Sequence, residues 1–400
     1  MKIVIVSGAR PNYMKIAPIV WAIRRLNQTA VPKLEFVLVH TGQHYDHNLF
    51  GVFFEELGLP APDFCLDVGS GSRNYQIETV IERLEPVLEK VHPDLVLVVG
   101  DVNSTLAAAL AGVKRRIQVA HVEAGLRSFD QTMPEEINRR LTDALSDYLF
   151  VTEESGRKNL LREGVTADKI FFVGNAMIDS LQQLRRLWER ATIHDDMGLE
   201  KNGYGVVTLH RPSNVDNQEV LAGIVDALIE VARELPVIFP VHPRTQKQLE
   251  ATAPGTGIVR FGERRVAGPG LYCIEPLGYL DFMALLAGAR LVMTDSGGIQ
   301  EEATVLNVPC LTLRENTERP VTITHGTNKL VGTSRDKIVA EAGQVLNDGR
   351  PALYPPPLWD GRAADRIVAV LNEQGRPIQP RRAAAAARSA VSRSDKPPLG

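Results

Sequence analysis

Short apolar runs alternate along the chain with longer stretches in which apolar residues recur at helical spacing. Such runs are typical of strands buried on both faces, and the stretches between them have the length of crossover helices, so the pattern predicts βαβ units around parallel sheets. The predicted strands form a first series at residues 3–6, 36–40, 95–99, 119–122, 148–151 and 170–173. A second series follows at residues 205–209, 237–241, 271–274, 291–294 and 310–313. The predicted fold class is therefore α/β with two parallel sheets.

The restart of the strand pattern indicates two lobes. A polar, glycine-containing segment at residues 191–204 separates the two series and is expected near the junction. We expect the first lobe at residues 1–175 and the second at 176–360, followed by an amphipathic helix within 361–374. Residues 376–400 are dominated by Ala, Arg, Pro and Ser and are predicted to be a disordered tail, because they offer too little apolar area to bury.

The composition excludes several classes of protein. The 400 residues are 44% apolar and 23% charged, as in water-soluble globular chains, and the net charge of −3 gives no long-range field for nucleic acid or an anionic membrane. No apolar run approaches the roughly 20 residues of a membrane helix, and no signal-peptide profile is present. We therefore expect a cytoplasmic protein without nucleic-acid or membrane partners.

The chain contains three cysteines, Cys65, Cys273 and Cys310. They are too few and too dispersed for a zinc site and are expected in the core.

Several catalytic signatures are absent from the sequence. The chain contains no G-x-G-x-x-G after a strand, no P-loop motif, no H-E-x-x-H, no C-x-x-C and no G-x-S-x-G. The sequence therefore gives no support for dinucleotide redox chemistry, P-loop chemistry, zinc-dependent hydrolysis or a serine-hydrolase nucleophile elbow. We expect neither a cofactor nor a metal.

Polar residues follow the predicted strands at seven places. Ligands of open α/β sheets bind beyond the carboxyl ends of the strands, so these positions are candidate site residues. A single polar residue there is usually a helix cap, but seven in register are hard to explain by capping alone. The seven groups are residues 7–11 with Lys15, 40–44, 100–101, 123–127, 210–212, 242–244 and 295–302.

The last of these groups is a candidate phosphate cradle. Ser296, Gly297 and Gly298 precede an apparent helix, whose first N–H groups and positive dipole end favour an anion. An ordinary serine cap with glycines for a tight turn explains the same residues equally well. Glu302 is positioned to accept hydrogen bonds from a ribose diol.

The other strand ends supply cations and carboxylates. The cations that could neutralise a diphosphate are Arg10, Lys15, His210, Arg211, His242 and Arg319. The carboxylates Asp101, Glu123 and Glu135 lie in the first half, together with the imidazoles His44 and His121. Each of these residues also has a simpler explanation. Any single cation could be an ordinary surface charge, and the helix dipole is enough to explain Glu135 at a helix start. His121 fits a buried histidine within a strand.

Eight motifs in this order resemble the non-hydrolysing UDP-N-acetylglucosamine 2-epimerases. They are G-A-R-P-N-Y-M-K-I-A-P, T-G-Q-H, G-D-V-N-S-T, H-V-E-A-G-L-R, P-E-E-I-N-R, H-R-P, T-D-S-G-G-I-Q-E-E and T-E-R-P. The resemblance extends from residue 1 to about 371. It implies two Rossmann-like lobes in the glycosyltransferase-B architecture, a UDP-sugar in the cleft between them, a last helix that returns to the first lobe, a homodimer, and a role in polysaccharide biosynthesis.

The resemblance also assigns roles to individual residues. As catalytic residues it implies Asp101, Glu123, Glu135, His210 and Lys15. As substrate-binding residues it implies Arg10, Gln43, His44, His242, Phe282 under the uracil, Ser296, Gly297, Gly298, Glu302 and Arg319. The sequence departs from the commonest family pattern at Asn12 and at Asp46, so the substituents of the sugar and activation by a second substrate molecule both stay open.

The expected reaction needs no cofactor. Carbon 2 of a sugar nucleotide has no adjacent carbonyl, so simple proton abstraction would give an unstabilised carbanion. Departure of UDP from C1 acidifies the C2 proton and leads to a 2-acetamidoglucal, which can be reprotonated on the other face. The open alternatives are a 2-epimerase of an oxidised or diacetamido UDP-sugar, a UDP-sugar glycosyltransferase, a hydrolysing relative and a UDP-sugar sensor.

Overall fold

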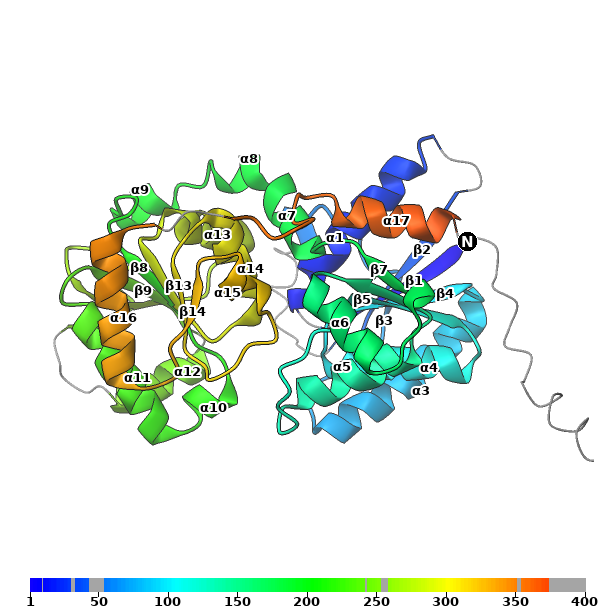
Figure 1. Ribbon diagram of the computed structural model, residues 1–400, viewed down its shortest axis with the longest axis horizontal. Helices are drawn as coiled ribbons and strands as arrows, with labels where there is room; N and C mark the ends of the chain where they lie inside the picture. Colours follow the sequence, from blue (N-terminus) through cyan, green and yellow to red (C-terminus); the bar gives the residue numbers. More distant parts are fainter. Residues whose placement is uncertain are drawn as a thin grey trace, which may run out of the picture.

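The computed structural model describes residues 1–8, 10–29, 33–42, 54–241, 243–252, 258–350 and 354–373. These residues form two lobes, each built on one parallel sheet of seven strands (Figure 1). Alternate residues of β1 (Lys2–Ser7) belong to different apolar clusters, with Ile3 and Ile5 on one face and Val4 and Val6 on the other. Both faces of the sheet are therefore covered, which explains why the strands are continuously apolar.

The first sheet has the order β3-β2-β1-β4-β5-β6-β7. Its other strands are β2 (Glu35–His40), β3 (Phe64–Cys65), β4 (Leu95–Val99), β5 (Gln118–Ala124), β6 (Tyr148–Val151) and β7 (Ile170–Phe172). Its helices are α1 (Arg10–Leu26), α3 (Arg73–Val91), α4 (Asn103–Lys114), α5 (Pro134–Leu145) and α6 (Glu154–Arg162), with a 3-10 turn at Ala167–Lys169. The strand order reverses between β1 and β4, which is where ligands bind in such sheets.

The second sheet has the order β10-β11-β9-β8-β12-β13-β14. Its strands are β8 (Gly205–Thr208), β9 (Pro236–Pro240), β10 (Val259–Phe261), β11 (Gly270–Ile274), β12 (Leu291–Thr294), β13 (Cys310–Thr312) and β14 (Asn328–Leu330). Its helices are α10 (Pro212–Val215), α11 (Gln218–Val231), α12 (Pro243–Thr252), α13 (Tyr279–Gly288), α14 (Gly297–Leu306), α15 (Val321–Thr324) and α16 (Arg335–Asp348). Here the order reverses between β8 and β12.

Four helices connect the lobes. They are α7 (Ala176–Gln183), α8 (Arg185–Trp188), α9 (Ile193–Met197) and α17 (Ala363–Glu373). Helix α7 packs against α1 of the first lobe and α14 of the second, and α17 returns to pack against α1 and α7 (Figure 1). Asp179 of α7 caps α17 by accepting hydrogen bonds from the backbone N–H groups of Ala363 (3.1 Å) and Ala364 (2.7 Å). Helix α17 is thereby held beside the first lobe.

The α/β prediction with two parallel sheets is confirmed, and every predicted strand is present. The sequence patterns missed β3, β10 and β14, which have two or three residues each and lie at sheet edges. Cys65 lies on β3 and is exposed, so its assignment to the core was wrong, whereas Cys273 and Cys310 are buried. The predicted tail at 376–400 lies outside the described residues.

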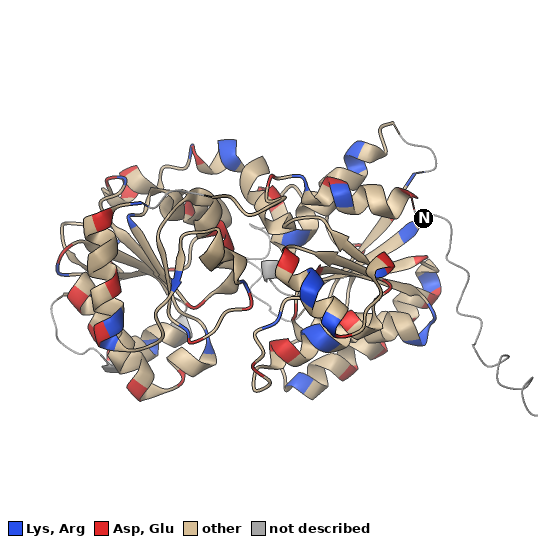
Figure 2. Cartoon of the chain, in the orientation of Figure 1, with Lys and Arg blue, Asp and Glu red and all other residues tan. Residues whose placement is uncertain are grey.

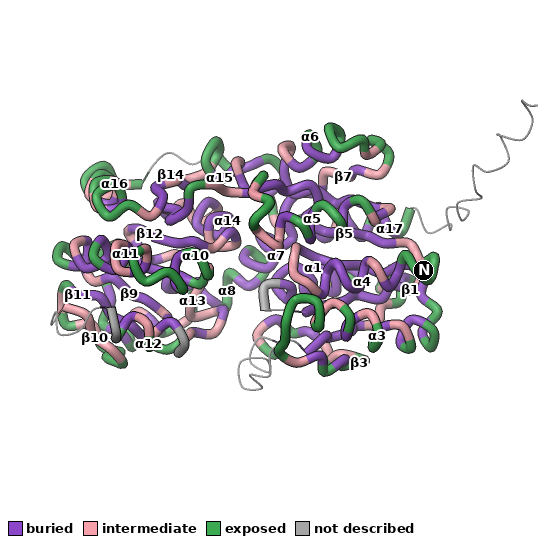
Figure 3. Tube along the Cα trace, turned by 90° about the horizontal axis from the view of Figure 1, so that it is seen from below, coloured by how far each residue is buried: buried purple, intermediate pink, exposed green. Residues whose placement is uncertain are grey.

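Charge and burial follow the layered architecture. Lysines and arginines are interspersed with aspartates and glutamates over both lobes (Figure 2). The central strands are buried, and exposed positions concentrate on outer helices such as α16 (Figure 3). None of the helices in the described ranges is long and apolar enough to cross a membrane.

Candidate active site

The polar ends of the two sheets meet between the lobes. Arg319 follows β13 of the second lobe, and its Nη2 donates to Oε1 of Glu123 on β5 of the first lobe. Both side chains are nearly buried, with 6% and 7% of their surface exposed. Residues 196 positions apart in the chain are therefore joined in one charged cluster.

The first lobe contributes Lys15 of α1 and Glu123 to this cluster. Lys15 Nζ forms an ion pair with Oε2 of Glu123. Gly100 follows β4 with a φ of +70°, and a Cβ at this position would lie 3.2 Å from Lys15 Nζ and 3.5 Å from Glu123 Oε2. Glycine is needed here for both the left-handed backbone and the room that the ion pair occupies.

Glu123 itself has an unusual backbone. Its φ is +76°, and the pairing of β5 with β6 shifts register between Val122 and Ala124, as at a β-bulge. A non-glycine residue in the left-handed region is strained, and such residues cluster at functional sites where their surroundings hold them in place. The bulge directs this carboxylate into the cluster, where each of its oxygens has a cationic partner.

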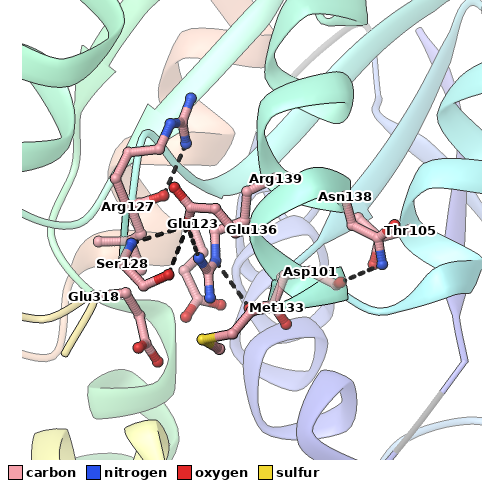
Figure 4. Close-up of polar contacts among 12 residues, drawn as sticks. Asp101, Thr105, Glu123, Arg127, Ser128, Met133, Glu136, Asn138, Arg139 and Glu318 are labelled. Atoms are coloured by element: carbon pink, nitrogen blue, oxygen red, sulfur yellow. Dashed lines mark hydrogen bonds and ion pairs between the residues drawn. The ribbon is translucent and has the colours of Figure 1, made fainter. Parts of the chain in front are cut away.

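Asp101 is held by α5 of its own lobe, as Figure 4 shows. Arg139 Nε lies 3.0 Å from Asp101 Oδ2, and Asn138 Nδ2 donates to the Asp101 carbonyl at 2.9 Å. Arg139 Nη1 in turn donates to Glu136, whose Oε2 also accepts from the Ser128 backbone N–H at 2.9 Å. Burial alone would raise the pKa of Asp101, but the charges of Arg139, Lys15 and Arg319 outweigh it and lower that pKa below its ordinary value.

The second lobe organises its polar residues around Asp295. This buried carboxylate follows β12 and accepts hydrogen bonds from the backbone N–H groups of His210 (3.1 Å) and Arg211 (3.0 Å). Its Oδ1 also lies 2.9 Å from Nδ1 of His210, whose side chain is 62% exposed. Burial raises the pKa of Asp295, but the hydrogen bond and charge of His210 outweigh it, so the net shift is downward. Asp295 therefore fixes the orientation of the His210 imidazole.

Arg319 is surrounded by carboxylates. Its Nη1 donates to Glu318 at 2.5 Å and its Nε lies 2.7 Å from Glu301, in addition to the contact with Glu123. A Cβ on Gly297 would lie 2.5 Å from Arg319 Nη1, so only glycine allows α14 to begin this close to the guanidinium. The positive end of α14 is thus built against the same cluster as the catalytic candidates of the first lobe.

Three buried carboxyl groups near this cluster hold their protons more tightly than usual. Burial raises the pKa of Glu301 to about 7, that of Glu302 to about 8 and that of Glu153 to about 7. The charge of Glu301 adds to the shift at Glu302, where a hydrogen bond from Tyr279 opposes it. Glu302, predicted to accept from a ribose, is therefore buried between Tyr279 and the charge of Glu301.

His121 supports the site from within β5. The imidazole is fully buried, with Nδ1 2.7 Å from Asp143 Oδ1 and Nε2 2.8 Å from the Gly100 carbonyl. Arg127 Nη2 lies 2.7 Å from the other Asp143 oxygen. The interpretation of His121 as a buried strand histidine is confirmed, since both ring nitrogens have structural partners.

Other predicted residues lie around the cluster. Ser296 and Gly298 are half-buried at the start of α14, and Phe282 is half-buried on α13. Glu135 is half-buried at the start of α5, and its charge acts on Arg211 of the second lobe.

Several predicted residues have no described side chain. Arg10 begins α1, but its side chain lies outside the described part of the chain, and so do Gln43, His44, Asp46 and His242 as whole residues. Asn12 is buried, accepting from the Gly8 N–H (3.1 Å) and donating to the Val99 carbonyl (3.2 Å), so it has a structural role in the turn after β1.

Sequence reasoning missed the charged residues that hold the candidates in place. The missed residues are Glu136, Arg139 and Glu318, whereas Asp295 and Glu301 lie in the predicted group 295–302 but were given no role of their own. Asp295, Glu301 and Glu318 stand inside the family motifs, where position along the chain gives no sign of what they contact. Glu136 and Arg139 are spaced i, i+3 on α5, a spacing that also suits an exposed surface pair.

The fold and the site together define the structural class to which the protein belongs. Two Rossmann-like lobes with a charged cluster where the carboxyl ends of their sheets meet, and a last helix returning to the first lobe, are the glycosyltransferase-B architecture. The chain belongs to the UDP-N-acetylglucosamine 2-epimerase family, whose sequence profile matches residues 26–372.

Individual relatives agree with this assignment. A crystal structure of the Methanocaldococcus jannaschii UDP-GlcNAc 2-epimerase with UDP-GlcNAc and UDP is 42% identical, with a TM-score of 0.83 over 93% of this chain and 100% of that one. The Neisseria meningitidis UDP-GlcNAc 2-epimerase bound to UDP-GlcNAc is 30% identical, with a TM-score of 0.82 over 93% and 100%. The UDP-2,3-diacetamido-2,3-dideoxy-D-glucuronate 2-epimerase of Pseudomonas aeruginosa is 42% identical over 93% of this chain and 99% of its own length.

Proposed function

We propose that this protein interconverts UDP-N-acetylglucosamine and UDP-N-acetylmannosamine by eliminating UDP and adding it back. Family membership supports an isomerase over the glycosyltransferase alternative. The observation that carries the proposal is the meeting of the first-lobe carboxylates with the second-lobe anion-binding groups, of which the Arg319–Glu123 contact is the clearest example. A UDP-sugar lying across the lobes would have its diphosphate near α14 and its C2 near Asp101 and Glu123.

The reaction proceeds in two balanced steps. In the first, the C1–O bond to UDP breaks, the electron pair leaves with the diphosphate oxygen, and a carboxylate takes the C2 proton, giving 2-acetamidoglucal and UDP. In the second, a proton is delivered to the opposite face of C2 and the UDP oxygen forms a bond to C1 again. No net oxidation occurs, so no redox partner is consumed.

The proposed roles follow the charge changes in these steps. Asp101 and Glu123 handle the C2 proton, and Glu135 stabilises positive charge on the sugar or delivers the second proton. The lowered pKa of Asp101 supports this role, because a carboxylate base must be deprotonated near neutral pH. Lys15 and His210 stabilise the departing diphosphate, aided by the start of α14.

The remaining groups are proposed to bind the substrate. They are Arg10, Gln43, His44, His242, Phe282, Ser296, Gly297, Gly298, Glu302 and Arg319. The position of Ser296, Gly297 and Gly298 at the start of a ten-residue helix supports a phosphate contact there.

The decisive experiment follows the C2 hydrogen. Purified protein is incubated with UDP-GlcNAc in D₂O, and NMR follows deuterium at C2, the manno product and free UDP. Deuterium in both epimers without accumulation of UDP is the expected result. Steady release of UDP with N-acetylmannosamine would identify a hydrolase instead, and epimerisation without deuterium would exclude proton exchange at C2.

A second candidate substrate is a UDP-2,3-diacetamido-2,3-dideoxy-glucuronate. The observation that favours it is the 42% identity to the Pseudomonas aeruginosa enzyme, as high as that to the Methanocaldococcus jannaschii enzyme. The same D₂O experiment with both UDP-sugars, compared by kcat/KM, distinguishes the two substrates.

We further propose that the protein acts as a homodimer in the cytoplasm, in polysaccharide biosynthesis. Support for a dimer comes from α5, whose Glu136 and Arg139 are buried beside the site while Ile137 and Leu141 remain 49% and 47% exposed. These two side chains line a groove of about 540 Å³. Sedimentation velocity on the wild type and on an Ile137→Glu, Leu141→Glu variant tests this surface, because a dimer that uses it becomes monomeric in the variant.

A further inference from the structure

His121 lies between the two carboxylates that are proposed to move the C2 proton. On β5 it precedes Glu123 by two residues, and it pairs with the end of β4, where Gly100 leads into Asp101. The imidazole is fully buried, with Nε2 2.8 Å from the Gly100 carbonyl oxygen and Nδ1 2.7 Å from Asp143 Oδ1. One side chain therefore joins the backbone beside Asp101 to helix α5.

The backbone at Gly100 is held by β5 through both of its polar groups. Its N–H donates to the Val122 carbonyl at 3.1 Å, and its carbonyl oxygen contacts His121. With a φ of +70°, Gly100 turns the chain out of the strand. The carbonyl belongs to the peptide that joins Gly100 to Asp101, so the imidazole sets the direction in which Asp101 leaves the sheet.

Asp143 of α5 holds the backbone on both sides of Glu123. Its Oδ2 accepts from the Gly125 N–H at 3.1 Å, and its Oδ1 contacts His121. These partners lie two residues after and two residues before Glu123. The left-handed φ of +76° at Glu123 is a strained conformation that persists only where its surroundings fix it. The two contacts of Asp143 supply that support.

The charges around His121 balance. Both of its partners are oxygen acceptors, so both contacts are hydrogen bonds when each ring nitrogen carries a hydrogen, as in the imidazolium. Arg127 Nη2 lies 2.7 Å from both Asp143 Oδ2 and Glu163 Oε2, so two cations meet two carboxylates. Burial raises the pKa of Asp143, but the hydrogen bond and charge of His121 and the charge of Arg127 outweigh it, and the net shift is downward. Asp143 is therefore ionised and accepts at both oxygens.

We propose that His121 is a positioning residue, which together with Asp143 fixes where Asp101 and Glu123 lie relative to one another. This inference rests on the proposed epimerase function, in which both carboxylates handle the C2 proton. His121 has no exposed surface, so it acts through the carboxylates rather than on the substrate. Such an effect is large, because a displacement of about 1 Å caused by a change away from the chemistry can slow a reaction about 10²-fold.

Two substitutions at His121 separate its two contacts. His121→Asn reaches only as far as Nδ1 and keeps a donor for Asp143, whereas His121→Gln reaches as far as Nε2 and keeps a donor for Gly100. We expect His121→Asn to slow C2 deuterium exchange about 10²-fold at saturating substrate with an unchanged dissociation constant for UDP, and His121→Gln to be less impaired. Equal losses in the two variants, or a loss of UDP affinity as large as the loss of exchange, would overturn the inference.

A double-mutant cycle shows whether His121 acts through Asp101. The variants are His121→Asn, Asp101→Asn and the combination, and the readout is again the rate of C2 exchange. If His121 acts through Asp101, the combined variant exchanges no more slowly than Asp101→Asn alone. In the corresponding cycle, Asp143→Asn is expected to add no loss to that of Glu123→Gln. Losses that multiply would mean that the pair stabilises the fold without positioning the carboxylates, and would overturn the inference.

Val119→Ala is the matched control. Val119 is fully buried on the same face of β5 as His121, two residues before it, but its apolar side chain offers neither hydrogen bond. We expect this variant to lose stability in thermal unfolding while its exchange rate stays close to that of the wild type. If His121→Asn does not fold, the cycle with Asp101→Asn is run with His121→Gln, whose smaller loss is expected to disappear in the combined variant.

Failure of this inference is distinguishable from failure of the proposed function. A wild type that exchanges the C2 hydrogen, together with an Asp101→Asn variant that exchanges as fast, would remove the residue through which His121 is proposed to act and overturn this inference alone. A wild type that exchanges the C2 hydrogen of neither UDP-sugar would overturn the proposed function, and this inference with it.

Discussion

Replacement of Arg139 by glutamine is expected to change the pH dependence of the enzyme. Arg139 is 2% exposed and its Nε lies 3.0 Å from Asp101. Burial raises the pKa of Asp101, and Arg139 is the largest of the charges that lower it again. In Arg139→Gln the effect of burial is less opposed, so the pKa of Asp101 rises.

The size of the change follows from the distance. An opposite charge within about 4–6 Å changes a carboxyl pKa by roughly 1–3. Because a base must be deprotonated, the acid limb of kcat/KM is expected to move to a pH higher by about 1–3 in Arg139→Gln. On the acid side of that limb, kcat/KM falls about tenfold for each pH unit by which the limb moves, while the rate at high pH falls less.

The assay is the pH profile of kcat/KM for epimerisation, measured on protein shown to be folded by circular dichroism. Loss of one partner of a buried ion pair costs about 3–5 kcal/mol, so this check is needed. Arg140→Gln is the control, because the neighbouring Arg140 is 52% exposed and its Nε lies 3.9 Å from Glu163. A folded Arg139→Gln protein whose acid limb coincides with that of the wild type would refute the reasoning.

Three shorter predictions address other parts of the structure. Burial and the charge of Glu301 raise the pKa of Glu302 from 4.5 to about 8, so the stability that this group contributes is present below pH 4.5 and is lost as the pH rises through about 8. Urea unfolding at pH 5 and pH 9 should therefore show a smaller loss of unfolding free energy at pH 9 in Glu302→Gln than in the wild type, and an equal loss would contradict the raised pKa. Gly297→Ala places a Cβ 2.5 Å from Arg319 Nη1. Calorimetry is expected to show at least about tenfold weaker UDP binding, the equivalent of about 1.4 kcal/mol. Unchanged affinity would show that the start of α14 can shift to make room. Asp179→Ala removes both hydrogen bonds to the start of α17 and should cost about 1–2 kcal/mol of unfolding free energy, whereas a loss near zero would mean that this cap is dispensable.

The strands could be predicted because parallel strands covered on both faces must be apolar throughout. Strands such as β4 and β12 are buried at every position and stand out in the sequence. The edge strands β3, β10 and β14 have two or three residues and only one neighbour, so their sequences carry little of this signal. Cys65 was misplaced for the same reason, since it lies on β3.

The candidate site could be predicted only in part. Residues that directly follow strands, such as Asp101 and His210, are indicated by the rule for parallel sheets. The rule that the apolar face of a helix packs against the protein does not hold for α5, because Glu136 and Arg139 are buried while Ile137 and Leu141 are exposed. Helical periodicity predicts which residues of α5 share a face, but it does not predict which face packs against the protein. The buried face is determined by the charged side chains that the fold places next to it.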